Sequence, residues 1–165
     1  MSARFQRITP FLWFDHQAEE AANFYVSVFE HSRIVTTTRY NAESAAASGR
    51  PEGSLMTAVF ELDDQQFVAL DGGPIFRFNE AVSLVVNCHS QDEVDYYWSK
   101  LAQGGDEKAQ QCGWLKDRYG LSWQVIPVEM IEMFSHSDPA KVSKMTDAMM
   151  KMKKIDLSLL RKAMN

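Results

Sequence analysis

Two side chains in this sequence have chemistry that an enzyme could use. Asp71 follows an apolar run, and a carboxylate beside apolar walls tends to have a raised pKa, which suits a general acid or base. Its alternative role is that of a solvated residue beginning the Gly72-Gly73 turn. Cys112 would be a nucleophile if its pKa were lowered, but the sequence places no histidine or helix N-terminus beside it. A small, buried apolar residue is therefore the alternative for Cys112.

Metal binding has weak support in the residue spacing. The four histidines show neither HxxxH nor HExxH spacing: His16, His31, His89 and His136. The only two cysteines, Cys88 and Cys112, lack CxxC spacing and the density of a disulfide scaffold. The residues thus predict no metal, no other cofactor and a reducing compartment.

The first half of the chain predicts the order strand, helix, strand, strand, strand. Residues 17–29 carry apolar side chains at three- and four-residue spacing, as an amphipathic helix does. Strands are expected at residues 8–14, 34–40, 54–62 and 66–71. Asp63-Asp64 predicts a hairpin turn between the last two strands. Residues 41–53 have no apolar periodicity, and we predict a mobile loop there, a possible lid.

The same order begins again after Gly72-Gly73-Pro74, and such a repeat indicates a duplicated unit. Ser90 predicts a helix N-cap, and Glu93 completes a capping box. The segment near 107–109, where a third strand would stand, is too polar to assign. The other elements expected in this half are a helix at residues 90–101 and strands at 81–88, 111–117 and 121–127.

Residues 128–165 predict a helical extension that belongs to neither repeat. Ser137-Asp138-Pro139 is typical of a helix start. A stripe of apolar residues follows at helical spacing: Val142, Met145, Met149 and Met152. We expect the stripe to pack in the core, with a groove for a protein partner as the alternative.

The tandem βαβββ order resembles the vicinal-oxygen-chelate (glyoxalase/bleomycin-resistance) superfamily. Within it, residues 8–14, 71–74, 85–88 and, most specifically, the Cys-Gly-Trp to Ser-Trp-Gln run at 112–124 resemble the PhnB-like branch, also catalogued as a demethylubiquinone methyltransferase-type domain. The resemblance covers nearly the whole chain, residues 7–163. It implies an α+β fold of half-barrel sheets around a cavity, assembled as a homodimer. We expect a single domain, 1–165, with modules at 7–73 and 81–127 and extra C-terminal helices at 128–165.

The resemblance also implies where a metal would bind. Metalloenzyme members of the superfamily use histidine and glutamate on the concave sheet faces, and the matching positions here are Pro10, Ala69, Ser83 and Gln124. Proline, alanine and serine side chains leave too few donors for a divalent metal. We therefore expect a metal-independent protein.

Strand alternation then suggests which side chains line the cavity. If Gln124 points inward, so do Ser122 and Ile126, whereas Trp123 points at the helices. Trp13 and Trp114 either wall the cavity or pack beneath the helices. Gln124 and Asn87 either orient a ligand or bond to nearby backbone. The ligand-binding candidates are Leu12, Phe14, Phe67, Asp71, Ser83, Asn87, Trp114 and Gln124.

Charge and composition reduce the classes of partner that we expect. The net charge is −5 and basic residues do not form a face for a phosphate backbone, so we expect no nucleic acid. The longest apolar run is too short for a membrane span or a signal peptide, and we expect a cytoplasmic protein.

The leading hypothesis is a binding protein for a small hydrophobic or carbonyl-bearing molecule. The alternative is an enzyme that uses Asp71, and Cys112 with it, on a hydrophobic carbonyl or quinone-like substrate. A third hypothesis is a partner-docking role for the methionine helix. Methyl transfer is not expected, because no glycine-rich strand-to-helix turn of the GxGxxG kind occurs.

Overall fold

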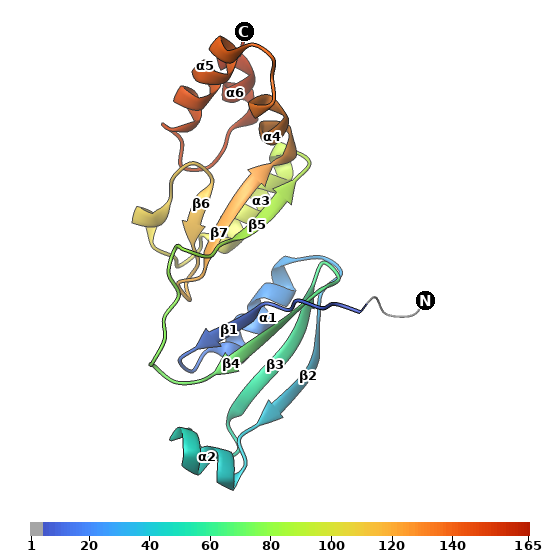
Figure 1. Ribbon diagram of the computed structural model, residues 1–165, viewed down its shortest axis with the longest axis vertical. Helices are drawn as coiled ribbons and strands as arrows, with labels where there is room; N and C mark the ends of the chain where they lie inside the picture. Colours follow the sequence, from blue (N-terminus) through green and yellow to red (C-terminus); the bar gives the residue numbers. More distant parts are fainter. Residues whose placement is uncertain (1–4) are drawn as a thin grey trace. The chain divides into compact units, whose positions relative to one another are not determined.

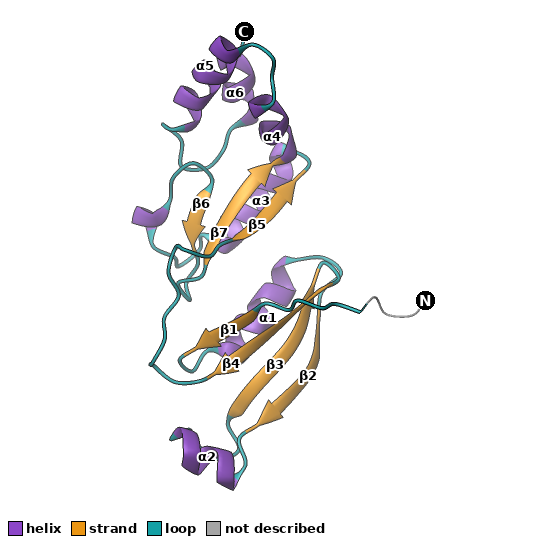
Figure 2. Cartoon of the chain, viewed as in Figure 1, coloured by secondary structure: helices purple, strands orange, loops and turns teal. Residues whose placement is uncertain are grey.

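The computed structural model describes residues 5–165 and divides into two compact units, one ending at Phe78 and the other spanning Asn79–Asn165 (Figure 1). Residues 1–4 of the predicted domain lie outside the described residues. Each unit contains one mixed sheet with a helix packed on it, which confirms the α+β class (Figure 2). Among residues 5–165 no helix is long and apolar enough to cross a membrane.

The first unit has a four-stranded sheet in the order β1-β4-β3-β2. β1 runs parallel to β4, and the β3 pairs with β4 and β2 are antiparallel. Its elements are β1 (Phe11–Phe14), α1 (Ala18–Val28), β2 (Arg33–Arg39), α2 (Ala42–Ser48), β3 (Leu55–Leu62) and β4 (Gln65–Asp71).

The predicted hairpin turn between β3 and β4 is confirmed. Asp63 and Asp64 have φ of 47° and 61°, the left-handed region that both central residues of a type I′ turn require. Aspartate tolerates this conformation, and the turn matches the twist of the two strands.

The expected loop at residues 41–53 contains a helix, α2, which corrects the sequence interpretation. The Asn41 side chain accepts from the Ser44 N–H at 2.9 Å, and the Ser44 hydroxyl accepts from the Asn41 N–H at 3.0 Å. The helix ends at Gly49, whose φ is 72°. None of its residues is buried, so apolar periodicity could not reveal it. Alanine propensity and the capping box form the helix instead.

The second unit repeats the topology with a sheet in the order β5-β7-β6, where β5 runs parallel to β7 as β1 does to β4. A short 3-10 helix, η1 (Glu107–Ala109), follows α3 at the point in the chain order where β2 follows α1. This agrees with the polar character of that segment. The other elements are β5 (Leu84–Cys88), α3 (Gln91–Leu101), β6 (Trp114–Lys116), β7 (Ser122–Pro127), α4 (Val128–Phe134), α5 (Pro139–Met149) and α6 (Leu157–Ala163).

The C-terminal helices form part of the second unit's core. Met145 is fully buried, and Met149 and Met152 pack against the same cluster, as the core interpretation of the stripe predicts. The cluster consists of Ile126, Met130, Met133, Met145, Ile155 and Leu160.

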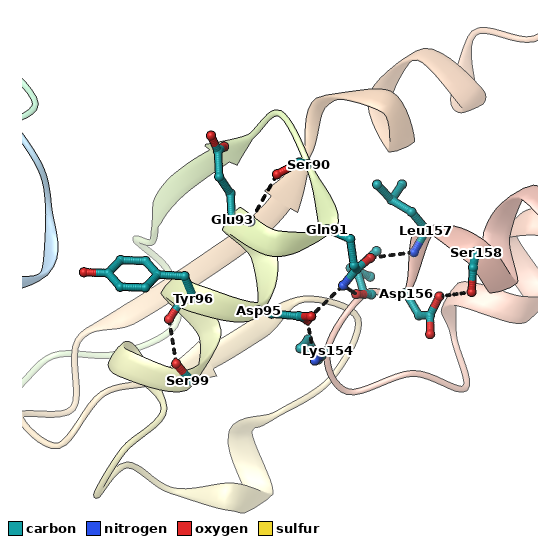
Figure 3. Close-up of polar contacts among 11 residues, drawn as sticks. Ser90, Gln91, Glu93, Asp95, Tyr96, Ser99, Lys154, Asp156, Leu157 and Ser158 are labelled. Atoms are coloured by element: carbon teal, nitrogen blue, oxygen red, sulfur yellow. Dashed lines mark hydrogen bonds and ion pairs between the residues drawn. The ribbon is translucent and has the colours of Figure 1, made fainter.

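Polar contacts from α3 fix the start of α6 (Figure 3). The Gln91 amide donates to the Ile155 carbonyl at 3.1 Å and accepts from the Leu157 N–H at 2.9 Å. Lys154 forms an ion pair with Asp95 at 2.5 Å. Because Gln91 satisfies two backbone groups at a helix start, it joins the extension to the repeat.

Candidate functional site

Helix α1 covers one face of the first sheet. The ring of Tyr25 stacks on Phe60 with centroids 6.3 Å apart, and Phe60 stacks on Phe67 at 5.6 Å. The Ala18 N–H donates to the Asp71 carboxylate at 2.7 Å. The face that carries Phe60, Phe67 and Asp71 is therefore the covered one.

Four predicted ligand-binding residues lie on this covered face, which corrects their expected orientation. Leu12 pairs with Ala69 and Phe14 with Asp71 in the sheet register. Leu12, Phe14, Phe67 and Asp71 are all buried. The alternation along the strands was predicted correctly, but the set of side chains that was expected to face the cavity faces α1 instead. The expected orientation followed from the resemblance, which put Pro10 and Ala69 on the concave face, and a shift of one residue moves every side chain to the other face.

Asp71 acts as a cap for α1. It is 5% exposed, which also excludes its alternative role as a solvated turn residue. Burial raises the pKa of its carboxyl group, and the bond from the Ala18 N–H acts against that rise. Gln17, the N-cap residue, makes no side-chain capping bond, so Asp71 supplies it from β4. The Tyr40 hydroxyl donates to the Asp71 carbonyl at 2.8 Å.

The opposite face of the first sheet carries aromatic and aliphatic side chains from β1, β3 and β4. In the register these are Phe11, Trp13, Val59, Val68 and Leu70. The Trp13 indole lies against Gly72: a Cβ there would fall 2.3 Å from its Cε2 atom. The indole N–H donates to the Gly73 carbonyl at 2.9 Å. Sequence reasoning missed Phe11 and left Trp13 open; the Gly72-Gly73 pair was the signal of a close approach.

The second sheet has the orientation that the sequence predicted. Its covered face carries the buried residues Val86, Cys88, Trp123 and Val125, and α3 packs there through Val94 and Leu101. Trp123 is 3% exposed, which confirms its predicted place in the core. Burial raises the pKa of the Cys88 thiol to about 12.

The uncovered face of the second sheet groups the remaining candidates. Val85 and Trp114 flank Gln124 in the register, and Asn87 lies two residues after Val85 on an exposed position. The Gln124 amide donates to the Ser83 hydroxyl at 2.9 Å. Ser83, Asn87, Trp114 and Gln124 thus share one face of one sheet.

Two other residues on this face differ from their expected surroundings. Ile126 was expected to line a cavity, but it packs among the C-terminal helices because the extension covers that end of β7. Ser122 is 1% exposed, and its hydroxyl has no hydrogen-bond partner within the described part of the chain. A buried hydroxyl of this kind is uncommon in folded proteins.

The Cys112 thiol lies against the α5–α6 connection. Its Sγ atom is 3.6 Å from the Met149 carbonyl oxygen and 3.7 Å from the Met150 sulfur. The Cys112 N–H donates to the Met152 carbonyl at 2.8 Å, and its φ is 52°. The contacts anchor the extension to the start of β6.

Asp117 explains much of the 112–124 motif, and sequence reasoning gave it no structural role. It is 2% exposed. Its carboxylate accepts from the N–H groups of Tyr119 and Leu121 at 2.9 and 3.1 Å, and from the Trp123 indole at 2.8 Å. The motif therefore specifies a hairpin whose turn is bonded to a buried carboxylate.

Both helices that follow a parallel strand have carboxylates at their N-termini. Asp71 serves α1, as described. At α3 the Ser90 hydroxyl accepts from the Glu93 N–H at 3.2 Å, and the Glu93 carboxylate accepts from the His89 N–H at 2.7 Å. The predicted Ser90 N-cap is confirmed, but the capping box is incomplete, because Glu93 bonds to the N–H of His89 and not to that of the N-cap residue Ser90. Neither N-terminus resembles an anion-binding turn, because the protein's own carboxylates take these positions.

Within residues 5–165, side chains that could hold a metal do not gather at either sheet. Among the residues that the structure describes, no group of three or more His, Cys, Asp or Glu side chains has the geometry of a metal site. Of the four positions that the resemblance points to, Ser83 and Gln124 bond to each other, Ala69 is buried under α1, and Pro10 has no side-chain donor atom.

Comparisons with known proteins agree with this architecture. The family model for 3-demethylubiquinone-9 3-methyltransferase matches residues 6–126. The PhnB protein of Bacillus cereus is 39% identical, with a TM-score of 0.63 over 74% of this chain and 99% of that chain. A Pseudomonas aeruginosa protein shares the fold at 20% identity, with a TM-score of 0.58 over 74% of this chain and 98% of its own.

A glyoxylase/bleomycin resistance protein/dioxygenase domain from Frankia aligns at 13% identity and a TM-score of 0.46, over 74% of this chain and 92% of that chain. No curated protein is significantly similar. The matched region of the family model ends within β7, so helices α4 to α6 are additional to it. The chain belongs to the 3-demethylubiquinone-9 3-methyltransferase family and is similar to its PhnB member from Bacillus cereus.

Proposed function

We propose that this protein binds a small hydrophobic, carbonyl-bearing molecule without a metal, on the uncovered face of its second sheet. The observation that carries the proposal is the Gln124–Ser83 hydrogen bond beside Trp114 and Val85. Small-molecule sites generally combine apolar walls with a few oriented polar groups, and this face has both.

The polar pair suits a ligand carbonyl. Because the Ser83 hydroxyl accepts the Gln124 amide N–H, its own hydrogen is available as a donor. The exposed Asn87 amide supplies further donors on the same face. Val85 is 48% exposed, an apolar surface that a flat hydrophobic molecule would bury.

The enzyme alternative has less support than binding. The Asp71 carboxylate is occupied by the first turn of α1, and the Cys112 thiol lies against the α5–α6 connection. Methyl transfer has no support in the chain's own residues: the strand-to-helix turns before α1 and α3 contain no glycine, and carboxylates occupy the positions where a donor's anionic group would bind.

We also propose that the protein acts as a homodimer. β1 and β5 are edge strands of their sheets, and each carries an exposed apolar residue, Phe11 at 59% and Val85 at 48%. Unpaired edges with apolar side chains favour pairing with another chain. Analytical ultracentrifugation should give the mass of two chains; a single-chain mass across the accessible concentrations would contradict the dimer.

Menadione, a flat molecule with two ring carbonyls, is a suitable probe for the binding function. Isothermal titration should detect binding to the metal-free, chelator-treated protein. Ser83→Ala and Gln124→Ala should each weaken it about tenfold, the value of one neutral hydrogen bond. Ser99→Ala and Gln103→Ala are matched controls because both residues are exposed and lie away from this face.

Equal affinity in the wild type and both site variants would refute the proposed site. Binding that disappears on chelation and returns with a divalent metal would refute metal independence. Native mass spectrometry of the untreated protein adds a second test, because a retained small molecule would identify the ligand class directly.

A further inference from the structure

Lys116 lies on the uncovered face of the second sheet, at the end where β7 begins. It alternates along β6 with Leu115, which is buried, and its register partner on β7 is Ser122. Two positions away along both strands, Trp114 pairs with Gln124. Because two residues of a strand span about 7 Å, a cationic side chain starts about that far from the proposed carbonyl site.

The counter-ion of Lys116 comes from the segment that precedes β5. Lys116 forms an ion pair with the Glu80 carboxylate. The hydrogen bond from Lys116 lowers the pKa of the Glu80 carboxyl, so both groups are charged at neutral pH. The Glu80 side chain is 64% exposed, and all of residues 79–82 are exposed. Exposed ion pairs contribute little to stability, so another carboxylate can take the place of Glu80.

This ion pair differs from two others in the second unit. One of those joins α3 to the segment before α6, and the other joins α4 to α6. The Lys116–Glu80 pair instead joins a strand to an exposed segment that belongs to no helix or strand. Separating Lys116 from Glu80 therefore moves a loop and does not require two helices to part.

The segment that carries Glu80 spans β7 at Ser122. The ion pair holds one end of the segment at Lys116, and the bond between Ser83 and Gln124 holds the other end. Ser122 lies between these two attachments in the register. Its hydroxyl is buried and has no partner within residues 5–165. Buried hydroxyls nearly always have a partner, so the closed segment covers a polar group that it does not satisfy.

We propose that the ligand of this face carries a carboxylate in addition to its carbonyl, and that this carboxylate replaces Glu80 on Lys116. The carbonyl accepts from Ser83 as in the proposed function, on which this inference rests. A carboxylate has two acceptor oxygens, so the one not bound to Lys116 can accept from the Ser122 hydroxyl once residues 79–82 have moved away. The ligand class is therefore a flat aromatic carbonyl compound with a carboxylate about 7 Å from its carbonyl.

The test compares anthraquinone-2-carboxylate with the neutral anthraquinone-2-carboxamide by isothermal titration on the full chain. The wild type should bind the carboxylate about tenfold more tightly, the value of a hydrogen bond to a charged group less the loss of an exposed ion pair. Lys116→Met removes the charge and should abolish this preference. Glu80→Gln should instead raise the affinity for the carboxylate about twofold to fivefold, because no internal carboxylate then competes.

The opposite responses of the two variants distinguish ligand binding from a purely structural ion pair. If the pair only held the segment in place, Lys116→Met and Glu80→Gln would change the affinity in the same direction. Binding of the carboxamide should be unchanged in Lys116→Met, which shows that the face remains folded. Lys144→Met and Glu132→Gln are matched controls on α5 and α4, because both residues are exposed, and neither should alter either affinity.

Four results would each overturn the inference. These are equal binding of the carboxylate and the carboxamide or no binding of the carboxylate, a preference that persists in Lys116→Met, a parallel loss of carboxamide binding in that variant, and a Glu80→Gln variant that does not bind the carboxylate more tightly. The menadione titration of the Ser83 and Gln124 variants decides the proposed function separately, because menadione has no carboxylate for Lys116.

Discussion

Replacing Asp71 by alanine should loosen the first turn of α1. The carboxylate accepts the Ala18 N–H at 2.7 Å, and Gln17 offers no capping bond in its place. Losing a helix cap costs about 0.5 to 2 kcal/mol, and a buried N–H left unpaired costs about 1 to 3 kcal/mol. These two terms describe the same bond, so we expect the free energy of unfolding to fall by about 2 kcal/mol.

Asp71→Asn separates the hydrogen bond from the charge. The amide oxygen can still accept the Ala18 N–H, so the loss should stay below about 1 kcal/mol. Urea denaturation followed by far-UV circular dichroism at neutral pH measures both values, and hydrogen exchange at Ala18 reports the cap directly. Asp147→Ala is the control, since Asp147 is exposed on α5. Equal losses for alanine and asparagine, with unchanged exchange at Ala18, would refute the capping role.

The pH dependence of Asp71 has a definite sign. Burial raises its pKa in the folded state above the ordinary value of 3.8, so the folded chain keeps this proton at a pH where the unfolded chain has lost it. The stability from this group is complete below the unfolded pKa and is lost as the pH rises through the folded pKa. Wild-type stability measured relative to Asp71→Asn should therefore fall as the pH rises from 3.8. If this relative stability instead rose above pH 3.8, the hydrogen bond from Ala18 would have a larger effect on the pKa of Asp71 than burial has.

Three further predictions concern packing and the extension. Gly72→Ala should destabilise the fold by about 2 kcal/mol, because its Cβ would lie 2.3 Å from the Trp13 indole. In a Trp13→Ala background the same change should cost little, and additive losses in urea denaturation would contradict the clash. Gln91→Ala should cost about 1 to 3 kcal/mol, because two backbone groups at the start of α6 lose their partner. Gln91→Glu keeps the acceptor but loses the donor, so its stability should lie between those of the wild type and Gln91→Ala. Thermal unfolding of the three proteins tests this order. Burial raises the pKa of the Cys88 thiol to about 12, so iodoacetamide in mildly alkaline buffer should not label Cys88 until urea unfolds the chain. Labelling of Cys88 in the folded protein, detected by mass spectrometry of its peptides, would contradict this prediction.

Features that depend on neighbouring residues were predictable from the sequence. The Asp63-Asp64 turn and the Ser90 N-cap were identified correctly because their dihedral angles and hydrogen bonds involve residues close in the sequence. The strands of the second sheet were oriented correctly, because the resemblance put Gln124 on the concave face and alternation then put Trp123 on the buried one.

Features without a local apolar signal were not predictable in the same way. Helix α2 has no buried residue, so the absence of apolar periodicity at residues 41–53 suggested a loop. Asp117 was part of a recognised motif, but its three donors come together only when the β6–β7 hairpin closes.

The sequence by itself determined the α+β class, the duplicated order of elements, the family and the two-residue alternation along each strand. It could not determine which set of alternating residues in the first sheet faces α1, because both phases satisfy the same pattern. That choice was decided by contacts between distant segments, the stacking of Tyr25 on Phe60 and the bond from Ala18 to Asp71 across 53 residues of sequence. For this reason Asp71 caps a helix, while Trp13 lies on the uncovered face against the Gly72-Gly73 turn.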